Sequence, residues 1–261
     1  MEYSKQIKCA LIGLSLLATA NLWSFSGSIQ TTEGGKFDGE IRLDKNVFTV
    51  KDTNGLLQTI RLDQLTLLRA HDRNKSAPQN ASESPASDDE AQPKRRNVPG
   101  LQLTGGSFIA RRVHLADDTW IKFTDSPKEA ALSTLSVARI YFQPPTPEVE
   151  DKLRRGRTGL LLKSNDFIEC EFKGISHGKI QVSSVLFGLK SFEPYRVMAL
   201  VLRDPKPAAA KFELRTKSDS CLLLNDFSVD KDRLTIQDPT MAGLQVAASE
   251  LFEIRRIVVG N

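Results

Sequence analysis

Residues 179–203, KIQVSSVLFGLKSFEPYRVMALVLR, carry the clearest structural signal in the chain. Apolar and polar residues alternate from Lys179 to Ser184, a glycine follows at Gly188, and an apolar run extends from Met198 to Leu202. Alternation over such short lengths is typical of β-strands, and glycine is typical of the tight turns that join them. The segment therefore predicts a strand, a tight turn, a second strand, a polar corner and a third strand.

The last quarter of the chain follows the same pattern. Thr216-Lys217-Ser218-Asp219 matches Lys163-Ser164-Asn165-Asp166, and Gly243-Leu244 matches Gly188-Leu189. Looser versions of the pattern precede these two, with turn residues such as Asn54-Gly55 between short apolar runs. This self-similarity predicts an internal repeat of roughly 45 to 55 residues.

We therefore predict an all-β protein made of four tandem small, strongly bent antiparallel sheets, Sm-like or SH3-like barrel units, after an N-terminal signal helix. The predicted divisions are a signal peptide at 1–25, β unit 1 at 26–72, a disordered linker at 73–99, β unit 2 at 100–145, a linker with a short helix at 146–157, β unit 3 at 158–205 and β unit 4 at 206–261. The segment 73–99 is predicted to be a disordered linker because it has almost no large apolar side chain to bury. Units of about 50 residues are marginally stable alone, so we expect neighbours to share apolar faces or edge strands.

The N-terminus has the pattern of an export signal. Lys5 and Lys8 precede an uncharged apolar stretch from Cys9 to Trp23, and Ala18-Thr19-Ala20 offers small residues for cleavage. The stretch of about 15 residues is shorter than the roughly 20 that span a bilayer. A cleaved signal peptide is our first interpretation. An uncleaved anchor and a buried helix are the alternatives. Both a cleaved signal peptide and an uncleaved anchor predict a periplasmic or extracellular protein.

The bulk composition is that of a globular protein. Of 261 residues, 40% are hydrophobic and 26% are charged, which excludes wholesale disorder. The formal net charge is only +4, and basic and acidic residues are interspersed along the chain. Nucleic-acid binding is not favoured, because such proteins concentrate their basic residues on one face.

The repeat also carries a resemblance to a known group of proteins. The succession of a turn, a strand, Gly178-Lys179-Ile180-Gln181-Val182, then Phe187-Gly188-Leu189, then Val197 to Leu202 resembles tandem β modules of uncharacterised exported bacterial proteins. In some relatives such modules precede carbohydrate-binding domains. The resemblance implies the fold and no functional residue, and it covers the second half of the chain best.

The motifs of common enzymes and metal sites are missing from the sequence. His71, His114 and His177 lack metal-ligand spacing, and there is no HExxH, GxSxG, phosphate-binding loop or CxxC pair. We therefore predict no enzyme activity, no cofactor and no metal. Cys170 and Cys221 fit either one disulfide or two buried positions in strands, and we favour the buried positions.

Three residues are candidates for binding. Trp120 on an outer strand face could stack on a sugar ring or anchor a partner, although packing in the core of unit 2 is the interpretation we favour. Arg111 and Arg112 form a basic pair that either contacts an acidic polymer or is simply solvated.

These observations predict an exported, non-enzymatic binding or assembly module that makes protein–protein contacts in the cell envelope. The predicted partner is an envelope or secreted protein, and membrane contact is expected only if the signal segment is retained. One alternative is a carbohydrate-binding module that uses Trp120. Another is a hydrolase with its site between units.

Overall fold

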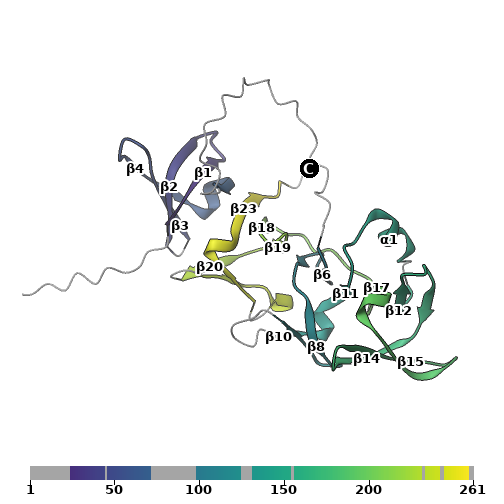
Figure 1. The fold of residues 1–261 in the computed structure, drawn as a ribbon. Helices are drawn as coiled ribbons and strands as arrows, with labels where there is room; N and C mark the ends of the chain where they lie inside the picture. Colours follow the sequence, from purple (N-terminus) through teal and green to yellow (C-terminus); the bar gives the residue numbers. More distant parts are fainter. Residues whose placement is uncertain are drawn as a thin grey trace, which may run out of the picture.

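The computed structural model describes residues 24–44, 46–71, 98–124, 131–153, 156–230, 233–241 and 244–258 (Figure 1). The predicted linker lies outside these ranges except for Val98 and Pro99, and so does the signal segment except for Ser24 and Phe25. Those last two residues begin the first described strand, which therefore overlaps the end of the predicted signal peptide. None of the helices in these ranges is long and apolar enough to cross a membrane.

The described part of the chain is built of short strands. They are β1 (Ser24–Thr31), β2 (Lys36–Asp44), β3 (Val47–Lys51), β4 (Leu57–Arg61), β5 (Leu65–Ala70), β6 (Gly100–Leu103), β7 (Phe108–Ile109), β8 (Val113–Ala116), β9 (Trp120–Phe123), β10 (Ala131–Ser133), β11 (Val137–Tyr141), β12 (Gly159–Leu162), β13 (Phe167–Glu169), β14 (Glu171–Ser176), β15 (Lys179–Ser184), β16 (Gly188–Phe192), β17 (Val197–Val201), β18 (Phe212–Thr216), β19 (Cys221–Leu224), β20 (Phe227–Asp230), β21 (Arg233–Ile236), β22 (Gln245–Ala247) and β23 (Leu251–Arg256). One α-helix, α1 (Pro147–Lys152), and the 3₁₀ helices η1 (Leu62–Gln64), η3 (Thr134–Ser136), η4 (Pro194–Arg196), η5 (Pro239–Met241) and η6 (Ala248–Glu250) accompany them within the described ranges. The all-β prediction is confirmed, and so is the strand, turn, strand, corner, strand succession of 179–203.

The strands do not form four separate sheets. Every strand pairing is antiparallel, and the described strands join into three sheets. One has fourteen strands in the order β13-β12-β17-β11-β6-β7-β19-β18-β23-β5-β1-β2-β3-β4. The others are β10-β9-β8-β14-β15-β16 and β20-β21-β22. None of these orders returns to its starting strand, so the prediction of separate, barrel-like sheets is corrected: strands that were predicted to lie in different units pair with one another.

A common order of pairing recurs along the chain. Each last strand pairs with the first strand of its own segment, as β5 with β1, β11 with β6, β17 with β12 and β23 with β18. A 3₁₀ helix (η1, η3, η4 or η6) immediately precedes each last strand. The second strand of the last three segments is interrupted, and its two halves lie in different sheets. The halves are β7 and β8, β13 and β14, and β19 and β20.

The turn after each first strand has a single geometry. Gly34, Gly106, Asn165 and Asp219 all have positive φ, at 83°, 96°, 71° and 68°. Each donates its N–H to the carbonyl three residues earlier. Glycine, asparagine and aspartate are the residues that tolerate this conformation. Asp219 therefore occupies the same turn position as Asn165, so the sequence match of Asp219 with Asp166 was wrong by one residue.

The last strands also pair with one another. β11 pairs with β17, and β5 pairs with β23, which joins the first and last quarters of the described chain (Figure 1). At the second junction Arg69 on β5 donates two hydrogen bonds, from Nε and from a terminal nitrogen, to Oε2 of Glu253 at 3.0 and 2.8 Å. The Glu253 side chain is almost fully buried, and its Oε1 has only an ion-pair contact with Arg255, at 3.2 Å.

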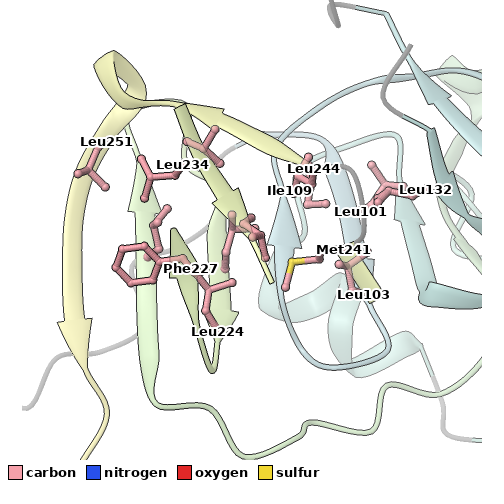
Figure 2. Close-up of a cluster of buried hydrophobic side chains, with 14 of the residues drawn as sticks. Leu101, Leu103, Ile109, Leu132, Leu224, Phe227, Leu234, Met241, Leu244 and Leu251 are labelled. Atoms are coloured by element: carbon pink, nitrogen blue, oxygen red, sulfur yellow. The ribbon is translucent and has the colours of Figure 1, made fainter. Parts of the chain in front are cut away.

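The apolar core runs continuously across the segments. Figure 2 shows Met241 and Leu244, from the connection between β21 and β22, lying among side chains of the segment that begins at Leu101. Met241 is 1% exposed and Leu244 is 3% exposed. The helix η5, which contains Met241, lies against β10. The connection between β21 and β22 therefore acts as a docking element inside the protein.

We predict that Arg69→Met destabilises the protein, because it leaves the buried Glu253 carboxylate with a single cationic neighbour. The Arg69 side chain is half exposed, so we expect a loss of about 1–3 kcal/mol in the free energy of unfolding rather than the full cost of an orphaned buried charge. Urea denaturation of both proteins measures the difference.

Arg42→Met is the matched control, because Arg42 and Glu40 form an ion pair in which both side chains are well exposed. Equal urea midpoints for the two variants would show that the β5–β23 ion pair contributes nothing.

Candidate functional site

Trp120 lies at the surface, which corrects the expectation that it packs in a core. In β9, Ile121 and Phe123 are buried on one face, so the alternation of the strand turns Trp120 and Lys122 to the other face. Trp120 is 50% exposed. The backbone N–H groups of Trp120 and Thr119 donate to Oδ1 of Asp117, and these bonds hold the pKa of that carboxyl below its usual range.

The two arginines do not join Trp120 in one site. The Arg111 guanidinium lies 5.8 Å from the centre of the Phe123 ring, and the Arg112 carbonyl accepts the N–H of Thr124. Both therefore lie beside the far end of β9, and the four residue steps from Trp120 to Thr124 span about 13 Å in an extended chain. The three predicted binding residues belong to two different places on the surface.

Arg112 instead lines a pocket with a volume of about 320 Å³. We call this the β8–η4 pocket, and its walls come from elements far apart in the sequence. The lining residues are Pro99, Arg112, Val113, His114, Ile140, Tyr141, Phe142, Gln143, Ile175, Gly178, Pro194 and Tyr195. A volume at the lower end of the range for small-molecule sites fits a ligand of one or two rings.

A β-bulge exposes His114 to the pocket. Val113 pairs with Phe123 and Leu115 pairs with Lys122, so the ladder between β8 and β9 skips His114. An extra residue in one strand bends it and redirects a side chain, and bulges often accompany functional sites for this reason.

The pocket combines an apolar floor with polar groups at its opening. Ile140 and Ile175 are buried core residues, whereas Arg112, His114 and Tyr195 are exposed. None of the lining residues is acidic. The nearby carboxylate of Glu193 lies 3.7 Å from the ammonium group of Lys179, so their charges offset each other. Among the lining residues, Arg112 supplies the cationic charge, and the Arg196 guanidinium lies 6.0 Å from the centre of the Tyr195 ring.

A buried polar network supports the strand behind the pocket. The Tyr141 hydroxyl donates to Oε1 of Glu150 at 2.6 Å, and Arg139 donates to Oε2 of the same carboxylate at 2.7 Å. Burial, aided by the Glu150 charge, raises the pKa of Tyr141 well above its usual range. Thr146 caps α1, and Glu150 on this helix ties it to β11 through the two bonds.

The turn between β15 and β16 forms the most exposed apolar feature in the described ranges. We call Val185, Leu186, Phe187 and Leu189 the apolar tip; Val185, Leu186 and Leu189 are 104%, 91% and 71% exposed. Lys190 lies between two rings, 5.4 Å from the centre of Phe187 and 5.5 Å from that of Phe192. Three consecutive apolar residues before a turn glycine were the signal in the sequence, and sequence reasoning did not identify it as a site.

The histidine and cysteine side chains considered from the sequence also have defined positions. His71 lies beside Asp38, Glu40 and Asp52 in a second surface hollow. No group of three His, Cys, Asp or Glu residues within the described ranges could hold a metal ion. Cys170 is buried and Cys221 is half-buried, and neither forms a disulfide. Burial raises the pKa of the Cys170 thiol.

Comparison with known proteins adds no identity to these sites. No protein-family model, no curated protein and no solved structure matches the chain.

We predict that Tyr141→Phe lowers the free energy of unfolding by about 1–2 kcal/mol at neutral pH, because Oε1 of Glu150 loses its hydroxyl donor. The variant should also lose part of the alkaline destabilisation. Tyr141 in the unfolded chain ionises near pH 10, while the folded protein keeps it protonated, so the wild type loses stability as pH rises above 10.

Urea denaturation between pH 8 and pH 11 measures both effects. Wild type and variant should converge in stability above pH 10, because phenylalanine does not ionise. A constant difference across the whole range would contradict the raised pKa.

Proposed function

We propose that the protein is an exported, non-enzymatic assembly module built from four copies of one five-strand Sm-like or SH3-like unit. The proposal of four units rests on the recurring order of strand pairing, the four turns at Gly34, Gly106, Asn165 and Asp219, and a 3₁₀ helix before each last strand. Export rests on the apolar N-terminal pattern of the sequence.

The observation that carries the proposed role is that two equivalent connections, β21–β22 and β15–β16, have different environments. The connection between β21 and β22 buries Met241 and Leu244 against other strands of the same chain (Figure 2). The connection between β15 and β16 stands at the same point of its own unit, between the third and fourth strands, and leaves its apolar tip in solvent. The protein therefore docks one such connection internally and leaves the equivalent one free to dock on a partner.

The chemistry of the tip defines the partner. Residues 185–192, VLFGLKSF, carry one charge, on Lys190, and the row of side chains is otherwise apolar or small. Exposed apolar residues of this kind mark interaction sites when they are contiguous. We infer a partner protein with an apolar groove between strands and an acidic residue at its rim that pairs with Lys190.

Strand addition gives the contact a second component. β16 is the last strand of its sheet, and in the described ranges only β15 pairs with it. An extended segment of the partner would continue the sheet along this edge, with main-chain hydrogen bonds for affinity and the tip for specificity.

We predict that Leu186→Asp weakens binding of the partner, because it places a carboxylate at the centre of the apolar contact. Proteins captured from envelope extracts by the full chain at high salt are identified, purified and titrated against both forms by calorimetry. We expect at least a tenfold loss of affinity, since the change removes apolar burial and adds a desolvation cost.

Leu135→Asp is the matched control, because Leu135 is also well exposed, at 69%, but lies on η3 away from the tip. Equal loss in both variants would contradict a role for the tip. Self-association that depends on Leu186 in sedimentation, or Leu186-dependent binding to anionic vesicles, would replace the inferred partner by a second copy or by a membrane surface.

Carbohydrate binding at Trp120 is the second candidate. It is favoured by the half-exposed Trp120 on a sheet face that also carries the exposed Leu115, which pairs with Lys122. An aromatic ring on a flat strand face offers a stacking surface for sugar rings.

Trp120→Ala should then abolish neutral-glycan binding on an array while leaving the urea midpoint nearly unchanged, because the side chain is half in solvent. Absence of any glycan signal that depends on Trp120 would leave protein assembly as the remaining role.

A further inference from the structure

The β8–η4 pocket has the features of a ligand site that is independent of the apolar tip. We infer that it binds an acidic sugar, a ring that carries a carboxylate, either free or as a unit of an acidic polysaccharide. Its volume of about 320 Å³ accommodates one or two sugar rings.

Arg112 supplies the recognition of the carboxylate. Its side chain is exposed at the pocket opening and forms no ion pair with any described residue. A guanidinium can hold a carboxylate through two parallel hydrogen bonds, which are stronger and more directional than bonds between neutral groups. No acidic residue lines the pocket to compete with the ligand.

The remaining lining fits a ring with hydroxyl groups. Phe142, Pro99, Pro194 and the ring of Tyr195 offer apolar surfaces to the C–H faces of a sugar. The His114 imidazole and the Gln143 amide both donate and accept hydrogen bonds, which is what hydroxyl groups require. A phosphate or sulfate ion alone would leave the apolar surfaces unused.

The walls of the pocket are held in place before any ligand arrives. The N–H groups of Phe142 and Gln143 donate to the carbonyl of Met198 on β17, at 3.0 and 3.3 Å. The bulge fixes His114 at the opening, and η4 presents Tyr195 immediately after Pro194. Preorganised walls of this kind lower the entropic cost of binding.

The pocket and the apolar tip lie at opposite ends of one hairpin strand. Gly178, at the pocket, precedes β15, and the tip follows its last residue, Ser184. Six residues of strand span about 20 Å. A ligand in the pocket therefore does not need the partner that we propose for the tip, and each can be tested without the other.

Calorimetry of the full chain tests the inference with a galacturonic acid trimer, a galactose trimer of the same length without charge, galacturonic acid itself and inorganic phosphate. We expect the acidic trimer to bind at least tenfold more tightly than the neutral one, because only its carboxylates pair with Arg112. The single sugar reports whether one ring suffices or the polymer is required.

Arg112→Gln should weaken the acidic trimer about tenfold or more and leave the neutral trimer unchanged. Arg111→Gln is the matched control, because it removes the same charge from the neighbouring residue, whose guanidinium lies over Phe123 and does not line the pocket. Tyr195→Ala should weaken both trimers, since the ring of Tyr195, which is 61% exposed, contacts the sugar face.

Three results would overturn the inference. Equal losses in Arg111→Gln and Arg112→Gln would indicate general attraction to a basic surface. Phosphate that binds as tightly as the trimer would indicate a simple anion site. No binding of either acidic sugar at millimolar concentration would remove the ligand class altogether.

Discussion

The architecture depends on the last strand of each quarter of the chain, which pairs on both of its edges. β11 lies between β6 and β17, and β23 lies between β18 and β5. A strand of five or six residues in a small sheet would expose one row of backbone groups, and pairing two last strands satisfies both rows at once. The same pairing places Ile254 opposite Leu68 and joins apolar faces that would be too small to be stable alone. Together with the β7–β19 pair, in which Cys221 lies opposite Phe108, these pairings produce one continuous fourteen-stranded sheet.

Two strand connections differ in whether another part of the chain covers their apolar residues. One strand connection can bury its apolar residues only if a neighbouring unit offers a complementary face. Met241 and Leu244 find such a face near Leu103 and Leu132, whereas Val185 and Leu186 at the end of the β15–β16 hairpin do not. Apolar side chains that are nearly fully exposed reduce solubility and contribute nothing to folding, which is why we propose the apolar tip as the contact with a partner.

The β8–η4 pocket is formed by elements that lie far apart in the sequence. Its opening carries Arg112 and His114 from the region of β8 and Tyr195 from η4, and its floor is the core at Ile140 and Ile175. The bulge in β8 is a local irregularity that costs one pair in the ladder and turns a polar side chain toward the hollow.

Much of the local structure was determined by the sequence itself. Alternation predicted the strands and turns of 179–203, and residues such as Asn165 and Asp219 indicated turns, because backbone conformation at a turn depends on the residue that occupies it. The match of Asp219 with Asp166 failed by one position, since a turn is defined by which residue has positive φ, and that residue is Asp219 opposite Asn165. Alternation also fixed that Trp120 and Ile121 point to opposite faces of β9.

Only the tertiary structure decided which face of each strand is covered and which edges are paired. It exposed Trp120, separated it from Arg112, and joined Arg112 with Tyr195, eighty-three positions away, around one pocket. These outcomes depend on contacts between segments far apart in the chain, and the free energy of such contacts belongs to the pair of surfaces rather than to either sequence segment.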